Sequence, residues 1–274
     1  MTASTTLERD NSAATPPAIL SARDVALVYR TRTGSIAALK DLSLDVAAGE
    51  FVAILGPSGC GKSTFLKIVA GLIPASSGHV LLNGAATSKP RPDVGIVFQQ
   101  PALMPWKTVL DNVLITPLCL GRDMRAAREA ALALLRLVGL EAFAANYPFE
   151  LSGGMQQRVG LARGLVHDPA VLLMDEPFAA LDAMNREHMM IELQRLWLTT
   201  AKSVVFVTHS IPEAVFLADR VVVMSSRPGR VIDDIRVPFP RPRDLDTMVS
   251  APFGELCNHL RRLFVAPADR AAPP

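Results

Sequence analysis

The sequence predicts an α/β fold with a largely parallel sheet, an antiparallel edge sheet and a helical insertion. Short β-branched runs alternate with helical stretches around residue 60 and again from Ala170 onward. This alternation is typical of parallel strands joined by crossover helices. Between the two regions lies a stretch rich in Ala and Leu with helical spacing. The chain has 274 residues, half of them hydrophobic, and a chain of this size buries roughly three quarters of its extended surface.

The expected elements follow in order along the chain. Residues 23–30 and 43–47 predict the antiparallel edge sheet, and the strands of the parallel sheet are expected near 51–55, 94–98, 171–174, 203–207 and 221–224. A helix is predicted over 123–138, because apolar residues recur there at helical spacing: Ala127, Ala131, Leu134, Leu135 and Val138. Gly139 follows as a stop signal. A weak helix is expected near 253–264.

These elements divide the chain into three parts. Residues 1–18 are rich in Thr, Ser, Ala and Pro and lack the apolar core of a secretion signal, which predicts a disordered tail. Residues 19–240 are expected to form one α/β domain, with a helical subdomain at about 100–165. Residues 241–274 are expected to form a C-terminal tail with a short helix.

Composition restricts the partners and the compartment. The net charge of +2 gives no electrostatic case for nucleic acid. No apolar run approaches the roughly 18 residues that cross a bilayer, so we expect the chain to meet a membrane only through a partner. Cys60, Cys119 and Cys257 have neither metal nor redox spacing, which suits a reducing cytoplasm.

A glycine-rich loop follows the apolar run 51–55 and reads Gly-Pro-Ser-Gly-Cys-Gly-Lys-Ser-Thr from 56 to 64. A strand, such a loop and a following helix together form a cradle for nucleotide phosphates, in which backbone N–H groups and the helix dipole face the anion. The lysine supplies charge for the β- and γ-phosphates, and the serine hydroxyl is placed to ligate Mg²⁺. The predicted ATP-binding residues here are Gly56, Pro57, Ser58, Gly59, Cys60, Gly61, Lys62, Ser63 and Thr64.

Further motifs follow this loop in a fixed order. They are Val-Phe-Gln ending at Gln99, Leu-Ser-Gly-Gly-Met-Gln from 151 to 156, Met-Asp-Glu-Pro from 174 to 177, Ala-Leu-Asp ending at Asp182, and Val-Thr-His ending at His209. The set resembles the ATPase subunit of ABC transporters over about Val25 to Val237. Segments 101–112 and 175–182 are similar to the nitrate, sulfonate and taurine importer branch. The resemblance implies a P-loop NTPase (ABC ATPase) core with an antiparallel edge sheet and a helical subdomain.

The resemblance also assigns roles around ATP and Mg²⁺. Asp175, at the end of an apolar strand, would hold Mg²⁺ with Ser63 and Gln99, while Glu176 would polarise the attacking water. His209 would contact the γ-phosphate and orient that water, and Tyr29 would stack on adenine. Taken alone, an Asp-Glu pair at a strand end is a solvated edge or a helix cap more often than a catalytic pair. A tyrosine on a strand is more often part of the core.

A second subunit is implied by the signature segment. Two glycines before a helix free backbone N–H groups to meet an anion, and one chain cannot place both this site and its own phosphate loop on one ATP. The resemblance implies a head-to-tail homodimer with two ATP molecules at its seam, formed by Ser152, Gly153, Gly154, Gln156 and Asp182. Gly160 and Gly164 stand at positions of the signature helix where alanine is common. Either they lower the stability of the helix, or they allow another element to pack closely against it.

The expected function is that of an ATPase that energises an importer at the cytoplasmic face of the inner membrane. Its partners would be permease subunits and, indirectly, an extracytoplasmic binding protein for nitrate, a sulfonate, taurine or a similar small anion. Trp106 would meet the permease or else lie in the core. The alternative is an ABC-type ATPase of DNA repair or translation that is not coupled to transport. Repair proteins of that kind insert a long coiled coil between phosphate loop and signature, and none is found in this sequence.

Overall fold

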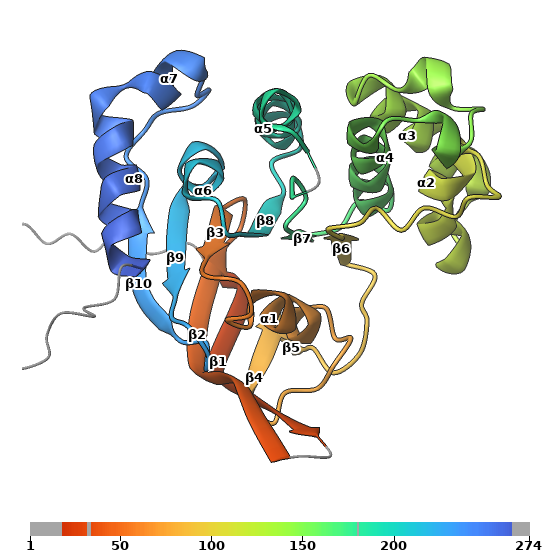
Figure 1. Ribbon diagram of the computed structural model, residues 1–274. Helices are drawn as coiled ribbons and strands as arrows, with labels where there is room; N and C mark the ends of the chain where they lie inside the picture. Colours follow the sequence, from red (N-terminus) through yellow and green to blue (C-terminus); the bar gives the residue numbers. More distant parts are fainter. Residues whose placement is uncertain (1–17, 32–33, 180, 265–274) are drawn as a thin grey trace, which may run out of the picture.

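The residues that the structure describes form two sheets, one helix packed with both sheets and two further groups of helices (Figure 1). The computed structural model describes residues 18–31, 34–179 and 181–264. The expected disordered tail falls on residues 1–17, which lie outside these ranges, and on Ala18, which begins strand β1 (Ala18–Thr31). Among the described helices, none combines the length and the apolar character needed to cross a membrane.

The larger sheet has six strands in the order β10-β9-β3-β8-β7-β6. The strand predictions are confirmed by β3 (Phe51–Leu55), β6 (Val94–Val97), β7 (Val171–Asp175), β8 (Ser203–Thr208) and β9 (Arg220–Met224). These strands are parallel to their neighbours, whereas β10 (Val231–Arg236) runs antiparallel to β9. Strands β3 and β8 are buried along their length. This is expected where helices or a second sheet cover both faces of a parallel sheet.

The smaller sheet is antiparallel, with the order β2-β1-β4-β5. Its strands β1 and β2 (Gly34–Ala47) extend well beyond the predicted segments, and β4 (Ser77–Leu82) and β5 (Ala85–Ala86) were not predicted. This sheet and helix α1 (Lys62–Val69) enclose one core with one face of the large sheet, through residues such as Leu42, Phe65 and Val205. The antiparallel strands therefore cover a face of the parallel sheet.

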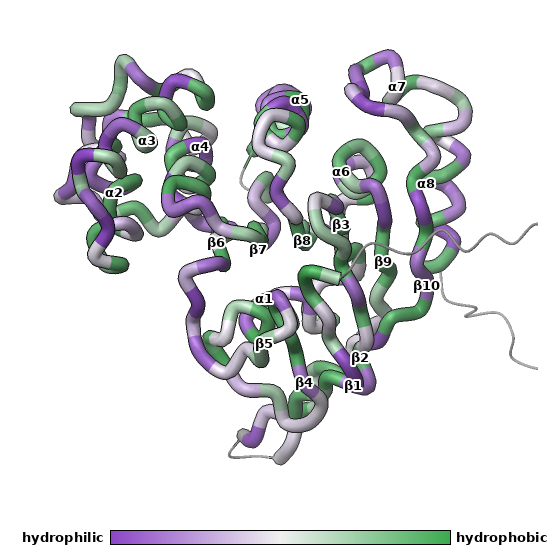
Figure 2. The backbone as a smooth tube through the Cα atoms, turned by 180° about the vertical axis from the view of Figure 1, so that it is seen from behind, coloured by the Kyte–Doolittle hydropathy of each residue, from purple (hydrophilic) through white to green (hydrophobic). Residues whose placement is uncertain are grey.

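The other helices form two groups (Figure 2). One group is the insertion, with α2 (Val109–Cys119), α3 (Met124–Leu137) and α4 (Gly153–Leu165), two short 3₁₀ turns (Glu141–Phe143 and Pro148–Glu150) and a core of its own. The other group, α5 (Ala183–Thr200), α6 (Ile211–Leu217), α7 (Leu245–Val249) and α8 (Ala251–Phe264), lies over the second face of the large sheet. Helix α4 contributes Leu161 and Leu165 to that second core, so it joins the insertion to the sheet.

This topology places the expected site. The strand order sets β3 between β8 and β9, with β7 beside β8. Ligands of open α/β sheets bind outside the carboxyl ends of the strands. The loops after β3, β7, β8 and β9 therefore meet at one edge, and they carry the phosphate loop, Glu176, His209 and Arg227.

Candidate functional site

The phosphate loop has a backbone shape that requires glycine at Gly61. This residue has φ 110°, and a Cβ there would lie 2.7 Å from Leu39 Cδ2 and 2.8 Å from the Ala38 carbonyl oxygen. Gly61 is also the N-cap of α1, so its conformation turns the chain directly from the loop into the helix. The helix begins at Lys62, which directs its N-terminal N–H groups toward the loop.

Lys62 is held inside this loop. Its side chain is 4% exposed, and Nζ donates hydrogen bonds to the carbonyl oxygens of Gly56 at 2.8 Å and Pro57 at 3.1 Å. A buried ammonium group needs such acceptors, because desolvation penalises an unpaired charge. Glu176 Oε1 lies 3.6 Å from the same Nζ atom. The lysine therefore joins the phosphate loop to the end of β7.

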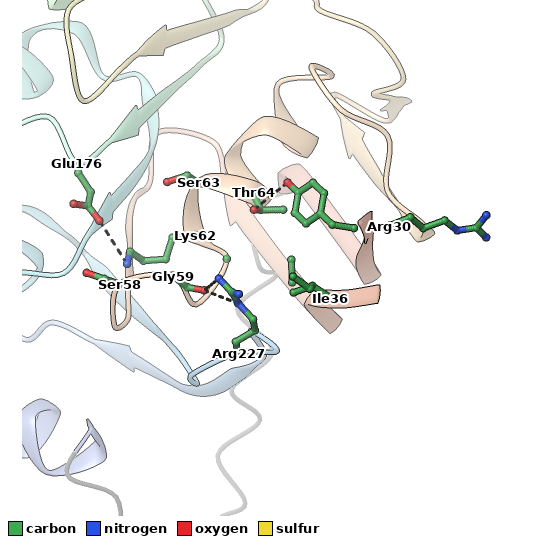
Figure 3. A pocket seen from close by; sticks show the side chains of 12 residues that line it. Arg30, Ile36, Ser58, Gly59, Lys62, Ser63, Thr64, Glu176 and Arg227 are labelled. Atoms are coloured by element: carbon green, nitrogen blue, oxygen red, sulfur yellow. Dashed lines mark hydrogen bonds and ion pairs between the residues drawn. The ribbon is translucent and has the colours of Figure 1, made fainter. Parts of the chain in front are cut away.

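A pocket of about 490 Å³ opens beside this loop (Figure 3). Its size is within the range of ligand sites. Tyr29 forms part of its wall, is 42% exposed and has its hydroxyl 3.4 Å from Thr64 Oγ1. The interpretation of Tyr29 as a core residue is therefore wrong. The pocket is lined by Tyr29, Arg30, Ile36, Ala38, Ser58, Gly59, Gly61, Lys62, Ser63, Thr64, Glu176 and Arg227.

Ser63, which lines the pocket, forms an oxygen pair with Asp175, which does not. Ser63 Oγ donates a hydrogen bond of 2.8 Å to Asp175 Oδ1. Burial raises the pKa of Asp175, while the hydrogen bond from Ser63 opposes the shift. A hydroxyl and a carboxylate side by side are the hard oxygen ligands that Mg²⁺ prefers. The pair fits that ion, whereas Gln99 is exposed and is not among the residues that line the pocket.

Glu176 and His209 face each other across the ends of β7 and β8. His209 Nδ1 lies 2.9 Å from Glu176 Oε2. The Glu176 backbone N–H donates to the Val207 carbonyl oxygen at 2.9 Å, which fixes the turn against β8. Glu176 has φ 44°, the left-handed region that costs an L residue energy. Glu176 lines the pocket. A carboxylate placed between a lysine and a histidine in this way can accept a proton from a water molecule in the pocket.

The signature segment lies on the insertion, outside the pocket lining. Ser152 is the N-cap of α4, and its Oγ accepts a hydrogen bond from the Met155 N–H at 3.3 Å. Ser152 and Gly153 are exposed and Gly154 is half-buried. Gln156 Nε2 donates to the Pro148 and Leu151 carbonyl oxygens at 2.9 and 3.4 Å. This amide therefore shapes the turn that presents Ser152, and it bonds within its own chain.

Asp182 is exposed at the start of α5. Its carboxylate accepts hydrogen bonds from the Asn185 N–H at 3.0 Å and from Asn185 Nδ2 at 2.7 Å. The Asn185 backbone hydrogen bond, followed by the side-chain one, lowers the pKa of Asp182. The remaining residues of the phosphate loop differ in exposure: Pro57, Ser58 and Gly59 are exposed, whereas Gly56 and Cys60 are buried.

Arg227 is a pocket residue that sequence reasoning missed. It follows β9 in a Ser-Ser-Arg-Pro-Gly-Arg turn, and its Nε and one terminal nitrogen donate to the Gly59 carbonyl oxygen at 3.2 and 3.1 Å (Figure 3). The sequence indicates a turn at this position. The contact could not be predicted, because Arg227 is far from the phosphate loop along the chain. Arg30, Ile36 and Ala38 were missed as well, because they lie on β1 and β2, which look like ordinary strands.

Comparison with known proteins is consistent with this geometry. The sequence model of the ABC transporter family matches residues 39–179. The taurine import ATP-binding protein TauB of Rhizobium johnstonii is 45% identical over 92% of this chain and 98% of its own length. The TauB protein of Burkholderia pseudomallei is 48% identical over 81% of this chain and 85% of its own length.

Solved structures agree with the fold. The dimeric ATP-binding cassette MJ0796, described in a post-hydrolysis state bound to ADP and Pi, matches with a TM-score of 0.71 and 35% identity. The match covers 81% of this chain and all of that one. The cbiO1 protein of Clostridium perfringens, part of the cbiONQ transporter complex, matches with a TM-score of 0.70 and 30% identity over 80% of this chain and 88% of that one. The chain therefore belongs to the ABC transporter family, as one of its ATP-hydrolysing cassettes.

Proposed function

We propose that this chain is the ATPase subunit of an importer for taurine or a similar small sulfonate. It would act as a homodimer at the cytoplasmic face of the inner membrane, bound to permease subunits that receive substrate from an extracytoplasmic binding protein. The taurine import proteins to which the chain is similar support the importer and its substrate class. The dimeric cassette to which it is similar supports the pairing of two copies.

The observation that carries the proposal is the cluster of Lys62, Glu176 and His209 beside the phosphate loop. Phosphoryl transfer to water requires positioning and charge neutralisation more than covalent chemistry. Lys62 would neutralise the β- and γ-phosphates, and Glu176 would polarise the water that His209 helps to orient. Tyr29, exposed on the pocket wall, would stack on adenine, which is worth about 1–3 kcal/mol for a base on an aromatic ring.

Mg²⁺ would be held by Ser63 and Asp175, whose oxygens already lie together. When bound, the ion neutralises charge on the phosphate oxygens. Gln99 is a proposed third ligand from the loop after β6, and its exposure leaves it free to move toward the pocket with that loop.

Each proposed ATP site is completed by the second subunit. The exposed tip at Ser152 and Gly153 precedes α4, whose N–H groups and dipole attract anions. This tip would close over the γ-phosphate bound by the other subunit, and Asp182 would link the two sites. Gln156 would support the tip through its bonds to Pro148 and Leu151.

An exposed aromatic surface on the insertion would receive the permease. The side chain of Trp106 is 72% exposed, which rules out the core interpretation of this residue. Tyr147 and Phe149 stack at 5.7 Å, and Phe149 is 75% exposed. A hydrogen bond from the Val109 N–H to the Asn146 carbonyl oxygen brings the two segments together. Exposed aromatic residues gathered in this way are typical of interaction surfaces.

Replacement of the proposed base tests the catalytic assignment. Glu176→Gln keeps the shape but removes the charge, so we expect ATP binding to persist and turnover to fall more than about a hundredfold. The variant should accumulate as an ATP-bound dimer in gel filtration. Glu129→Gln, at an exposed position on α3, is the matched control. Turnover of Glu176→Gln near that of the control would remove Glu176 from its assigned role.

Uptake measurements test the importer and its substrate. In cells that carry the permease and binding protein encoded with this chain, Trp106→Ala should reduce labelled taurine uptake and leave ATP binding by the purified protein unchanged. Val249→Ala, at an 83% exposed residue on α7, is the control. Uptake of nitrate or another anion in place of taurine would redirect the substrate assignment. Full ATP turnover with no permease that binds the chain would favour the alternative of an ATPase not coupled to transport.

A further inference from the structure

A buried carboxylate is hydrogen-bonded to Thr208, the residue before His209 of the proposed catalytic pair. Glu213, in the first turn of α6, is 5% exposed. Its Oε2 accepts a hydrogen bond of 2.5 Å from Thr208 Oγ1, and its Oε1 lies 3.5 Å from Arg186 Nε. Burial raises the pKa of Glu213, while the Thr208 hydroxyl and the Arg186 charge lower it. Buried carboxylates are stable only when paired and hydrogen-bonded, so these two contacts account for the position of Glu213.

Arg186 extends the contact to the loop that carries Asp182. It lies in the first turn of α5, and a second guanidinium nitrogen donates to the Leu181 carbonyl oxygen at 2.8 Å. Its backbone N–H donates to the Asp182 carbonyl oxygen at 2.9 Å. One side chain therefore contacts both Glu213 and the loop at the proposed dimer seam. Because the guanidinium is rigid and planar, its two contacts fix the relative position of these groups.

Thr208 extends the contact to His209. While its hydroxyl donates to Glu213, the same oxygen accepts a hydrogen bond of 3.0 Å from the Ser210 N–H. The residues on both sides of His209 are therefore joined to one hydroxyl, and His209 lies 2.9 Å from Glu176. A change in the position of Glu213 would therefore move the His209 imidazole through one intervening residue, Thr208.

We propose that Glu213 and Arg186 are positioning residues that couple the Asp182 loop to His209, and through it to Glu176. The inference rests on the proposed function, in which Asp182 meets the second subunit and His209 and Glu176 orient water. Docking of the partner on the Asp182 loop would shift Arg186. This shift would change the position of the His209 imidazole through Glu213 and Thr208. The pair would thus make hydrolysis depend on the formation of the dimer.

A role confined to folding is the competing explanation. An acidic residue in the first turn of a helix is favourable by itself, and a buried ion pair stabilises the fold only weakly. That explanation predicts that loss of Glu213 lowers the melting temperature and affects ATP binding and turnover together. The positioning role predicts that kcat falls while KM for ATP stays unchanged.

The test uses Glu213→Gln and Arg186→Met in the full chain, with Glu129→Gln as the control in an exposed Arg–Glu pair. Glutamine keeps the acceptor for Thr208 and removes the charge that faces Arg186. We expect each variant to lower kcat about 10- to 100-fold, as loss of a supporting contact does, with KM near that of the control. Arg186→Met leaves the buried Glu213 carboxylate without its cation, so this variant should also lower Tm. The double variant should be no slower than the slower single variant, because both changes break one link. Arg186→Lys should recover part of the rate.

A variant of Asp182 tests the coupling between the Asp182 loop and His209. Asp182→Ala should lower kcat in the unchanged chain but add little in Glu213→Gln, since the link is already broken. Independent, multiplicative effects would overturn the proposal, as would unchanged kcat in both single variants or a loss that follows Tm and KM. Arg186 is 36% exposed, so Arg186→Met carries the test if Glu213→Gln does not fold. If the unchanged chain neither hydrolyses ATP nor dimerises, the proposed function itself fails.

Discussion

Glu176 combines an expected catalytic role with an unfavourable backbone. At φ 44° its Cβ crowds the following carbonyl group, a conformation that glycine adopts freely. The turn is held because the Glu176 N–H bonds to Val207 and its carbonyl oxygen accepts from the Ala179 N–H at 3.1 Å. Strain of this kind persists where the surrounding structure fixes it, and it is concentrated at functional sites.

The strain at Glu176 can be measured. Glu176→Ala removes the carboxylate and keeps the Cβ, whereas Glu176→Gly removes both. We expect the glycine variant to be more stable than the alanine variant by about 1 kcal/mol, the cost of a left-handed L residue. Urea unfolding of the two proteins gives the comparison, and both should lack ATP turnover. Equal stabilities would mean that the turn stores no strain at this position.

Cys60 should react slowly despite its place in the phosphate loop. Its side chain is 1% exposed, and burial raises the pKa of the thiol, against the effect of the Lys62 charge. The thiolate is the reactive form, so the raised pKa and the lack of solvent access both slow alkylation. With iodoacetamide near neutral pH, mass spectrometry of the native protein should find Cys119, which is exposed, modified well before Cys60. Denaturation should abolish the difference; rapid labelling of native Cys60 would contradict its burial.

At the residue scale the sequence was informative where a motif is contiguous. The phosphate loop and the Asp175–Glu176 pair could be placed because a strand end and a glycine-rich turn each carry a local pattern. Arg227 could not be placed in the same way, since its contact with Gly59 depends on β9 lying beside β3. The environment of Glu213 depends similarly on α5 and α6 meeting above the sheet.

Elements were predicted where periodicity or burial is strong. The buried strands β3, β7 and β8 are continuous apolar runs, and α3 has clear helical spacing. Strand β10 alternates between half-buried and exposed residues and carries two Asp residues, which hid it. Helix α6 is short and almost wholly buried, so it has no polar face to reveal its period. These elements take their form from tertiary packing more than from local preference.

The two glycines of α4 differ in their surroundings. A Cβ at Gly164 would lie 3.2 Å from Val97 Cγ2 and 3.3 Å from Leu172 Cδ1, which supports close packing of α4 on β6 and β7. At Gly160 the nearest atom, Pro101 Cβ, would be at an ordinary 3.7 Å. Gly160→Ala should therefore stabilise the protein by up to about 1 kcal/mol through helix propensity. Gly164→Ala should gain less or destabilise in chemical unfolding; an equal gain at both sites would remove the packing argument.

At the scale of the whole molecule, the two halves of the proposed ATP site lie on different parts of one chain. The phosphate loop, Glu176 and His209 follow the carboxyl ends of β3, β7 and β8, and Ser152 caps α4 of the insertion. Figure 1 shows these strands and α4 in different parts of the molecule. In a symmetric pair each site would take its loop from one subunit and its tip from the other. Variants defective in different halves should therefore complement each other when mixed.

Gly153→Asp is suited to this test. A Cβ at Gly153 meets no atom within 4 Å, and an aspartate at the first position of α4 favours the helix dipole, so the fold should be retained. Its carboxylate would repel the partner's ATP phosphates. Lys62→Ala disables the other half of the site.

Each variant alone should be inactive. An equal mixture, exchanged by dilution and reconcentration with ATP, should recover roughly a quarter of the unmutated rate, because half the dimers are mixed and each has one intact site. A mixture no faster than its two components would contradict a site shared between subunits.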